Sequence, residues 1–290
     1  MPAMNGRTAL VTGATGGLGK AIATALAREG ASVVVVGRSA ARAEDAIRDI
    51  RAKEPDAVLE PLACDLSSQA SIRSAVDEFL SRHDKLDVLV NAAGVFRKER
   101  HVTPDGLELT FATNVMGYFL LTNLLLDALK RGGGADGART SRIVNIASKY
   151  SGGPSTTKID FDDLQTAKGN YSYLRATPPT MLGRVLLTQE FAERLRGSNV
   201  VVNAVHPGLV KHTALLQEVG GPFRWMTNTF GATAEKAADT PVWLATAPET
   251  AAVSGKLWAK RKQLPTPGMG SDPAARKRLW EECTRLSKIL

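Results

Sequence analysis

Few features of this 290-residue sequence point to secretion or to a membrane. Only two cysteines occur, Cys64 and Cys283, and a single pair is too few for a disulfide framework, which favours a reducing compartment. The longest apolar stretch, residues 118–129, is interrupted by polar residues and is shorter than the roughly 18 residues that a membrane-spanning helix needs. Residues 1–5 lead directly into a strand-like run and do not form a secretory signal. We therefore expect a cytoplasmic protein without a transmembrane segment.

Nucleic-acid-binding motifs are also absent, although the chain is basic. It has 37 Lys and Arg residues against 29 Asp and Glu residues, which gives a formal net charge of +8. The excess is densest in residues 256–262 and 276–288, near the C-terminus. A basic stretch without such a motif is typical of a solvated surface or of a contact between subunits. We predict no nucleic-acid partner and no metal site, and a contact within a homo-oligomer is one of the two explanations for the basic surface.

A Gly-rich turn near the start of the chain is the feature around which the rest is organised. Residues 11–19 read VTGATGGLG and lie between a strand-like run, 8–11, and a segment, 20–28, whose apolar residues recur at helical spacing. Glycines in such a turn let backbone N–H groups approach a pyrophosphate, and the helix N-terminus adds partial positive charge. A second β-branched run, 31–36, completes a strand–helix–strand unit. The turn predicts a dinucleotide site, although glycines also serve in ordinary tight turns.

Strand-like and helical segments alternate along the rest of the chain. Residues 41–53 predict a helix and residues 57–62 a third strand, while 86–90 form an unbroken apolar run that predicts a strand covered on both faces. This alternation favours one α/β domain over two smaller ones. We therefore assign residues 1–290 to a single domain.

Two residues beyond the turn bear on which dinucleotide is bound. Arg38 follows the second strand, where enzymes that select NAD usually place a carboxylate, and a cation there suits the 2′-phosphate of NADP. This favours NADP(H) over NAD(H), although Arg38 is also compatible with an ordinary helix entry. Asp65 follows the third strand and is a candidate for binding the adenine, while Asp65 or Ser67 could also cap the helix that begins near Gln69.

Several motifs together resemble the short-chain dehydrogenase/reductase family over nearly the whole chain. Besides the Gly turn they are Cys64-Asp65-Leu66, Asn91-Ala92-Ala93-Gly94, Asn114, residues 142–148 and His206-Pro207-Gly208. Phe111-Ala112-Thr113-Asn114 and Lys158-Ile159-Asp160-Phe161 look most like the retinol-dehydrogenase-like branch. Its members use NADP(H) or NAD(H) to interconvert alcohols and carbonyls, often on lipophilic substrates. The resemblance implies a Rossmann-type domain of about seven parallel strands with helices on both faces, assembled as dimers or tetramers.

The resemblance also implies which residues hold the cofactor. By position in this sequence they are Gly13, Thr15, Gly16, Gly17, Leu18, Gly19, Arg38, Asp65, Leu66, Asn91, Ala92, Gly94, Pro207, Gly208 and Val210.

The pattern breaks at the catalytic residues, which in the family are Asn, Ser, Tyr and Lys. Asn114 matches the Asn, and Ser148, after the strand 142–146, matches the Ser that hydrogen bonds the reacting oxygen. An alignment of the next helix without gaps puts Thr177 at the Tyr position and Met181 at the Lys position. Thr177 has no accessible ionisation, and Met181 has neither a charge nor a donor. Loss of a general acid alone costs on the order of 10²- to 10⁴-fold in rate.

The residues around Thr177 predict a changed pocket wall. Because Pro178 and Pro179 follow Thr177, we predict that Thr177 is an N-cap and that the helix begins at Pro178. Met181 would then replace a polar pocket floor by a thioether. Tyr150 and Tyr171 are alternative proton donors, against the ordinary role of packing or lining the pocket.

Residues 209–235 match the position of the family's substrate lid. Phe223, Trp225 and Met226 lie there among glycines, which suggests a hydrophobic small-molecule substrate, with a subunit contact as the alternative. His212 occupies the place where the family has a hydroxyl residue, and Thr213 follows it. His212 is either an acid or base near pH 7 or a solvent-facing loop residue. Residues 273–290 predict a basic C-terminal helix that packs on its own domain, on a partner subunit or on a membrane surface.

Three hypotheses for the function follow. The first is an enzyme that keeps the fold and the bound dinucleotide but catalyses a non-redox step, such as cyclisation, isomerisation or elimination, on a lipophilic metabolite. The second is a divergent NADP(H)-dependent oxidoreductase in which Ser148, a displaced Tyr or water delivers the proton. The third is a nucleotide-binding protein without catalysis. The retained turn and Ser148, beside the lost Tyr and Lys, favour the first.

Overall fold

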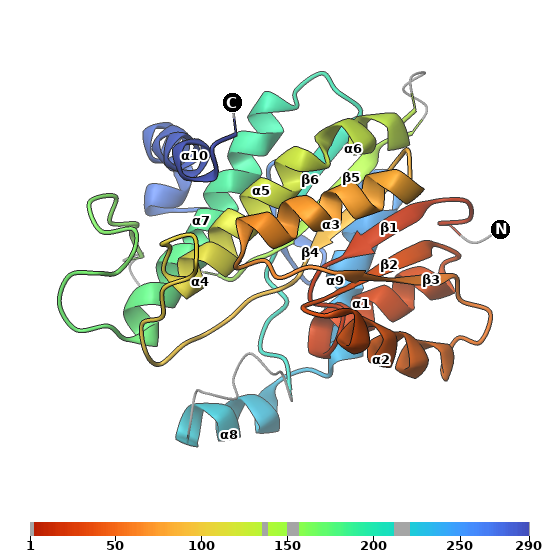
Figure 1. The fold of residues 1–290 in the computed structure, drawn as a ribbon, viewed down its shortest axis with the longest axis horizontal. Coiled ribbons are helices and arrows are strands. Elements are labelled where there is room, and N and C mark those ends of the chain that lie inside the picture. The colour runs from red at the N-terminus through yellow and green to blue at the C-terminus, as the bar shows by residue number, and fades with distance from the viewer. Residues whose placement is uncertain (1–2, 135–138, 150–156, 212–220, 290) are drawn as a thin grey trace.

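Eight strands form one sheet in the computed structural model, which describes residues 3–134, 139–149, 157–211 and 221–289 (Figure 1). Their spatial order is β3-β2-β1-β4-β5-β6-β7-β8. The strands are β1 (Thr8–Val11), β2 (Ser32–Gly37), β3 (Leu59–Ala63), β4 (Val88–Asn91), β5 (Ser141–Ile146), β6 (Val200–Val205), β7 (Leu257–Ala259) and β8 (Lys262–Leu264). Neighbours are parallel from β3 to β7, whereas β8 is antiparallel to β7. The α/β fold is confirmed, and an antiparallel edge strand is added to the seven parallel ones expected.

The helices alternate with the strands as far as β6. They are α1 (Gly17–Arg28), α2 (Ala40–Arg51), α3 (Gln69–Arg82), α4 (Leu109–Phe111), the π-helical η1 (Ala112–Met116), α5 (Gly117–Leu124), α6 (Leu126–Gly132), α7 (Tyr173–Arg194), α8 (Gly221–Phe230), α9 (Ala234–Thr246), the 3₁₀ turns η3 (Pro248–Thr250) and η4 (Gly268–Ser271), and α10 (Pro273–Ser287).

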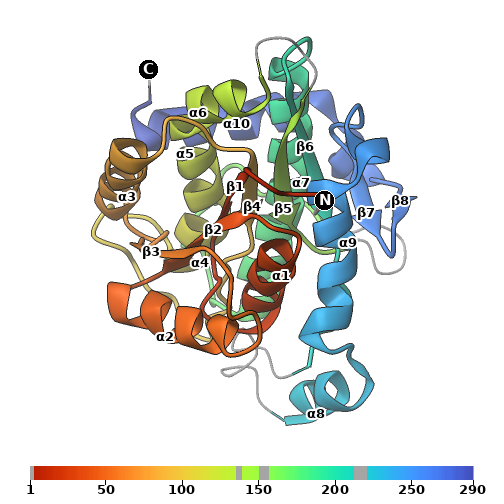
Figure 2. The same cartoon turned by 90° about the vertical axis from the view of Figure 1, so that its right-hand side faces the viewer.

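Two apolar cores lie on the two faces of the sheet. In β1, Leu10 packs into one core while Ala9 and Val11 pack into the other, as the period-two geometry of a strand requires. Helices α1, α2 and α9 cover the second face, and α3, α5 and α7 cover the first (Figure 2). Because both faces are covered, the strands are apolar throughout rather than alternating with polar residues.

The C-terminal helix α10 packs against α7 of its own domain. Trp280 of α10 meets Phe119 and Phe191 edge-on, with ring centroids 4.9 and 4.8 Å away. Among the three placements expected for this segment, the structure places it on its own domain.

No single helix within the described residues is long and apolar enough to cross a membrane. The pair Leu109–Leu124 and Leu126–Gly132, bent by 57°, meets the length and composition criteria only when both parts are taken together. Phe119 and Leu120 of this pair are buried in the core of the domain.

Candidate active site at the carboxyl ends of the strands

The order in which successive strands are added to the sheet reverses at β1, which pairs with β2 on one side and with β4 on the other. In doubly wound sheets, ligands bind outside the carboxyl ends of the strands at such a point. The Gly turn follows β1 there, and the segment that begins at Asn91 follows β4.

Close backbone packing fixes two glycines of the turn and leaves a third beside open space. A Cβ on Gly13 would lie 2.9 Å from Cα of Ala93, and a Cβ on Gly19 would overlap the backbone oxygen of Gly13. By contrast, no atom lies within 4 Å of a Cβ built on Gly16. Gly16 is the N-cap of α1 and gives it no side-chain cap, so the first N–H groups of α1 are left for a ligand. The turn therefore fits a pyrophosphate.

The other predicted residues of this turn support the same geometry. Gly17 has φ +50 and begins α1, and Leu18 packs on the core beneath. The methyl group of Thr15 lies 2.8 Å from where Gly37 would carry a Cβ, so the end of β2 fits closely against the turn.

The ends of β2 and β3 hold the residues predicted for the adenine half. Arg38 is exposed directly after β2, and Leu66 is buried. The carboxylate of Asp65 accepts hydrogen bonds from the backbone N–H and the hydroxyl of Ser67, over 2.9 and 2.7 Å. Neither residue caps α3, because Ser68 is the N-cap and accepts from the N–H of Ser71. The capping role considered for Asp65 or Ser67 is therefore wrong.

The segment after β4 is held by side chains from three elements. Thr12 accepts at its hydroxyl from the N–H groups of Ala92 and Ala93, over 2.9 and 3.2 Å. Tyr118 donates its hydroxyl to the backbone oxygen of Ala93 over 2.7 Å. The side chain of Asn91 donates to Asn145 and to Thr122, which fixes the end of β4 beside β5.

Asn114 lies within the π-helical turn η1, a local widening that is frequent at functional sites. Its side-chain oxygen accepts from the N–H of Val95 over 2.9 Å, and its side-chain nitrogen donates to the backbone oxygen of Val95 over 3.1 Å. The same nitrogen donates to the hydroxyl of Thr180 over 3.2 Å. Asn114 therefore ties η1 to the segment after β4 and to α7.

Helix α7 begins earlier than the sequence predicted. It spans Tyr173–Arg194 with Ser172 as N-cap, so Thr177 is not the N-cap and Pro178 is not the first residue. The N–H groups of Arg175 and Ala176 already bond to the backbone oxygen of Ser172. One helical turn therefore precedes Pro178 and Pro179, which lie in the second turn of α7. Because proline has no N–H group, one backbone hydrogen bond of the helix is lost at each of them.

The two positions where the catalytic Tyr and Lys were expected differ in burial. Thr177 is 3% exposed, and its hydroxyl has no hydrogen-bond partner among the described residues. Met181 is half-buried, and its sulfur lies 3.7 Å from Nη1 of Arg184. Ser148 is half-buried two residues after β5 ends.

Two tyrosines near the site, Tyr118 and Tyr171, have raised pKa values, whereas a tyrosine that transfers a proton needs a lowered one. Burial raises the pKa of Tyr118 to about 12, and burial also raises the pKa of Tyr171 to about 12. Tyr171 donates to the carboxylate of Glu108 over 3.0 Å and lies 3.1 Å from the hydroxyl of Thr110, so it belongs to a packing network. Tyr150 lies outside the described residues.

The sequence interpretation did not include Arg184, which the structure places at this site. Its side chain is buried, and it donates to three backbone oxygens: from Nε to Asn114 over 2.7 Å, from Nη1 to Ile146 over 2.9 Å and from Nη2 to Ala93 over 3.0 Å. The guanidinium also lies 4.1 Å from the ring centroid of Tyr118. The signal was a charged residue three positions after Met181 within the apolar stripe of α7.

The segment after β6 forms the other wall. Pro207 is half-buried, and Gly208 is exposed with φ +79. Val210 pairs with Ala232 in a parallel bridge, which joins the two ends of the predicted lid. The backbone N–H of His206 donates to Trp258, and burial, together with the nearby charge of Lys149, lowers the pKa of the His206 ring.

Part of the predicted lid is described. Helix α8 projects from the domain in both views (Figures 1 and 2). On it, Trp225 is 65% exposed and Phe230 is 73% exposed, and their rings meet edge-on with centroids 6.2 Å apart. His212 and the side chains of Phe223 and Met226 lie outside the described part of the chain.

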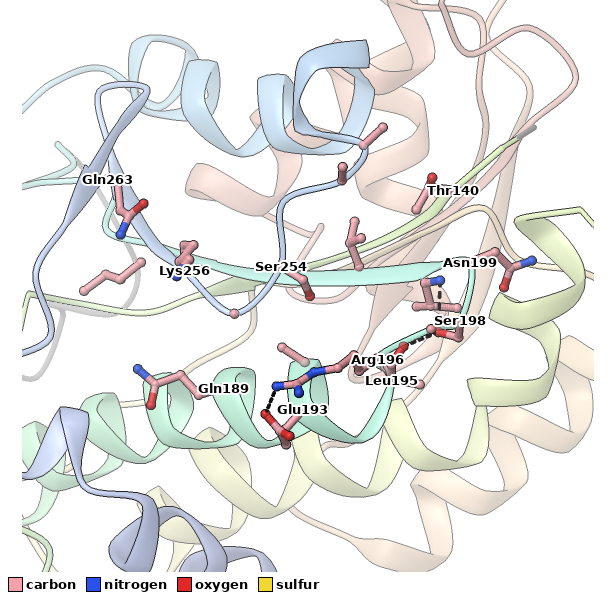
Figure 3. Close-up of a pocket in the computed structure, with 18 of the residues that line it drawn as sticks. Thr140, Gln189, Glu193, Leu195, Arg196, Ser198, Asn199, Ser254, Lys256 and Gln263 are labelled. Carbon is pink, nitrogen blue, oxygen red and sulfur yellow. Dashed lines mark hydrogen bonds and ion pairs between the residues drawn. The ribbon is translucent and has the colours of Figure 1, made fainter. Parts of the chain in front are cut away.

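A groove of about 1140 Å³ lies away from this site, beside the end of α7 and the start of β6 (Figure 3). Polar side chains line it, among them Gln189, Ser254 and an ion pair between Glu193 and Arg196. We place the candidate site at the Gly turn because the N-terminus of α1 has no side-chain cap there and the space beside Gly16 is open. Within the described ranges, no three His, Cys, Asp or Glu side chains gather as metal ligands.

Comparison with known proteins agrees with this geometry. The sequence model of a family described as short chain dehydrogenase matches residues 7–159. The chain is 37% identical over 292 aligned positions to human retinol dehydrogenase 13, covering 97% of this chain and 84% of that protein. Among solved structures, an uncharacterised protein from Mycobacterium paratuberculosis is 27% identical with a TM-score of 0.76, over 99% of this chain and 96% of that one. The 3-ketoacyl-(acyl-carrier-protein) reductase from Brucella melitensis, complexed with NADH, is 26% identical with a TM-score of 0.67, over 88% and 97%.

Proposed function

The chain belongs to the short-chain dehydrogenase family, and we propose that this member binds NADP(H) and a hydrophobic small molecule but catalyses a non-redox step. The observation that carries the proposal is the pair Thr177 and Met181. A buried hydroxyl without a described partner and a thioether stand where a proton donor and an ammonium are expected. Relatives that are named dehydrogenases support an enzyme of this class.

The proposed dinucleotide site rests on the turn after β1. The uncapped N-terminus of α1 and the open space at Gly16 would receive the pyrophosphate, and Arg38 after β2 would face the 2′-phosphate. When bound, the nicotinamide of such a cofactor can accept or give a hydride. The protein would not supply the matching proton, because Thr177 and Met181 replace the Tyr and Lys of the family and because burial raises the pKa values of Tyr118 and Tyr171.

The proposed reaction is cyclisation, isomerisation or elimination, in which no hydride is transferred and the net oxidation state of the substrate does not change. Ser148 would hydrogen bond the reacting oxygen, and the buried hydroxyl of Thr177 would stay neutral at every working pH. The exposed Trp225 and Phe230 on α8 favour an apolar substrate, and the name of the human relative points to a similar class.

A divergent oxidoreductase is the second candidate, because Arg184 supplies a buried cation close to Met181. One experiment separates the two. The protein is incubated with NADPH or NADH and hydrophobic aldehydes such as retinal, while nicotinamide absorbance and product composition are followed. The non-redox proposal expects binding of NADPH without its oxidation. Steady oxidation coupled to alcohol formation would establish the second candidate instead.

A further inference from the structure

We propose that Arg184 positions the nicotinamide half of the bound dinucleotide, a role that rests on the cofactor use proposed above. Arg184 is 4% exposed, and within the described ranges it forms no ion pair. By contrast, Arg194 of α7 and Arg276 of α10 both pair with the carboxylate of Glu190. A buried guanidinium without a carboxylate is costly, and carbonyl dipoles compensate it only in part.

The hydrogen bonds of Arg184 leave one donor for a ligand. A guanidinium has five N–H donors in a planar fork. Three of them reach the backbone oxygens of Ala93, Asn114 and Ile146, and a fourth points to the sulfur of Met181. The remaining N–H is on Nη2, which already contacts the segment after β4.

This donor lies next to Gly94. A Cβ on Gly94 would be 3.1 Å from Nη2 of Arg184 and 3.4 Å from the side-chain oxygen of Asn114. Gly94 has no side chain to cover the guanidinium, so a ligand can approach where any other residue would stand in the way. The same guanidinium also holds the backbone of Ala93, next to the place where the ligand would bind.

The order of the strands indicates which part of the dinucleotide lies there. The residues predicted for the adenine half follow β2 and β3, and the turn predicted for the pyrophosphate follows β1. The next strands are β4 and β5, and Arg184 bonds to the backbone after β4 and at the end of β5. The half of the dinucleotide beyond the pyrophosphate would therefore lie toward Arg184, and its sugar hydroxyls would be acceptors for the remaining guanidinium N–H.

Two ligands and one matched variant test this role. Binding of NADP⁺ and of adenosine 2′,5′-bisphosphate, which lacks the nicotinamide half, is measured by calorimetry on the full chain. The variants are Arg184→Met, Arg184→Lys and Arg142→Met. Arg142 is a suitable control because it is also 4% exposed and also donates to neutral oxygens, of Thr250 and Ala247, but at the other end of β5.

We expect Arg184→Met to weaken NADP⁺ binding by about 10- to 100-fold, as loss of a hydrogen bond from a charged group implies, while binding of the bisphosphate is unchanged. Arg184→Lys keeps the positive charge but loses the planar set of guanidinium donors. Its affinity for NADP⁺ should therefore lie between those of Arg184→Met and the unmodified protein. Arg142→Met should lower the melting temperature and leave both affinities unchanged. If Arg184→Met does not fold, selective weakening of NADP⁺ in Arg184→Lys carries the test.

Two results would overturn the proposal: equal NADP⁺ affinity in the Arg184 variants and the unmodified protein, or equal weakening of both ligands, which would mean a purely structural role. Failure of the unmodified protein to bind either ligand is a different result. It would contradict the proposed cofactor use and this inference together.

Discussion

The sulfur of Met181 lies 3.7 Å from Nη1 of Arg184, one turn further along α7. With Met181 at the position of the family's lysine and Arg184 three residues later, the site keeps a positive charge, but the charge is carried by a guanidinium instead of an ammonium. The pKa of an ammonium can shift toward neutrality, whereas a guanidinium stays charged and cannot take part in proton transfer. The site therefore holds a fixed charge next to Met181, and Thr177 cannot ionise either.

The glycines of the turn should separate folding from binding. Gly19→Ala would drive a Cβ into the backbone oxygen of Gly13, so we expect a loss of about 1–3 kcal/mol in the free energy of unfolding. Gly16→Ala meets no atom within 4 Å, at a φ of −176 that any residue can adopt, so the melting temperature should hardly change. The same methyl group would occupy the space proposed for the pyrophosphate, and NADP⁺ affinity should fall at least tenfold, or about 1.4 kcal/mol. Denaturation and calorimetry on both variants check this. An unchanged affinity in Gly16→Ala would place the dinucleotide elsewhere.

Thr177 and Thr180 form a second matched pair on α7. The hydroxyl of Thr180 accepts from the side chain of Asn114 and donates to the backbone oxygen of Thr177, whereas the hydroxyl of Thr177 has no described partner. We expect Thr180→Val to lower the free energy of unfolding by about 1–3 kcal/mol, because the donor of Asn114 is left unsatisfied. Thr177→Val should be neutral or stabilising. Chemical denaturation measures both, and a large loss in Thr177→Val would show that its hydroxyl has a partner in solution.

His206 should make stability fall in mild acid. Burial and the charge of Lys149 lower its pKa from the ordinary value of 6.5, so the unfolded chain binds a proton more readily than the folded one. The resulting stability is present above pH 6.5 and is lost as the pH falls from there through the folded pKa. In His206→Gln the melting temperature should therefore decrease less between pH 7.5 and pH 5 than in the unmodified protein. Equal decreases in the two proteins would mean that His206 does not contribute.

Both cysteines should be unreactive in the folded protein. Burial raises the pKa of Cys64 to about 12 and raises the pKa of Cys283 as well, and only a thiolate reacts readily. Treatment with iodoacetamide at pH 8 should give no adduct until denaturant is added, after which both residues should react. Mass spectrometry of the native sample measures this, and rapid labelling of Cys283 would show that α10 opens.

Local patterns predicted much of the site, and packing decided the rest. The Gly turn and the segment at Asn91 could be placed because each follows an apolar strand, and parallel strands bring their carboxyl ends together. The start of α7 was predicted wrongly, because Pro178 is a good first helical residue, yet tertiary contacts of the buried Ala176 extend the helix before it. The charge of Arg184 within the apolar stripe of α7 was visible in the sequence, but spacing could not show which groups its side chain contacts. Its side chain reaches back along α7 to carbonyls of three other segments, which only the fold brings together.

The most direct test of the account compares the unmodified protein with the double variant Thr177→Tyr and Met181→Lys. Both are loaded with NADPH and given retinal or a long-chain aldehyde, and nicotinamide absorbance is followed after binding has been verified by calorimetry. We predict that the unmodified protein binds NADPH without oxidising it and that the double variant gains measurable turnover. Oxidation by the unmodified protein at a rate equal to or above that of the double variant would contradict the central claim that the site lacks its proton relay.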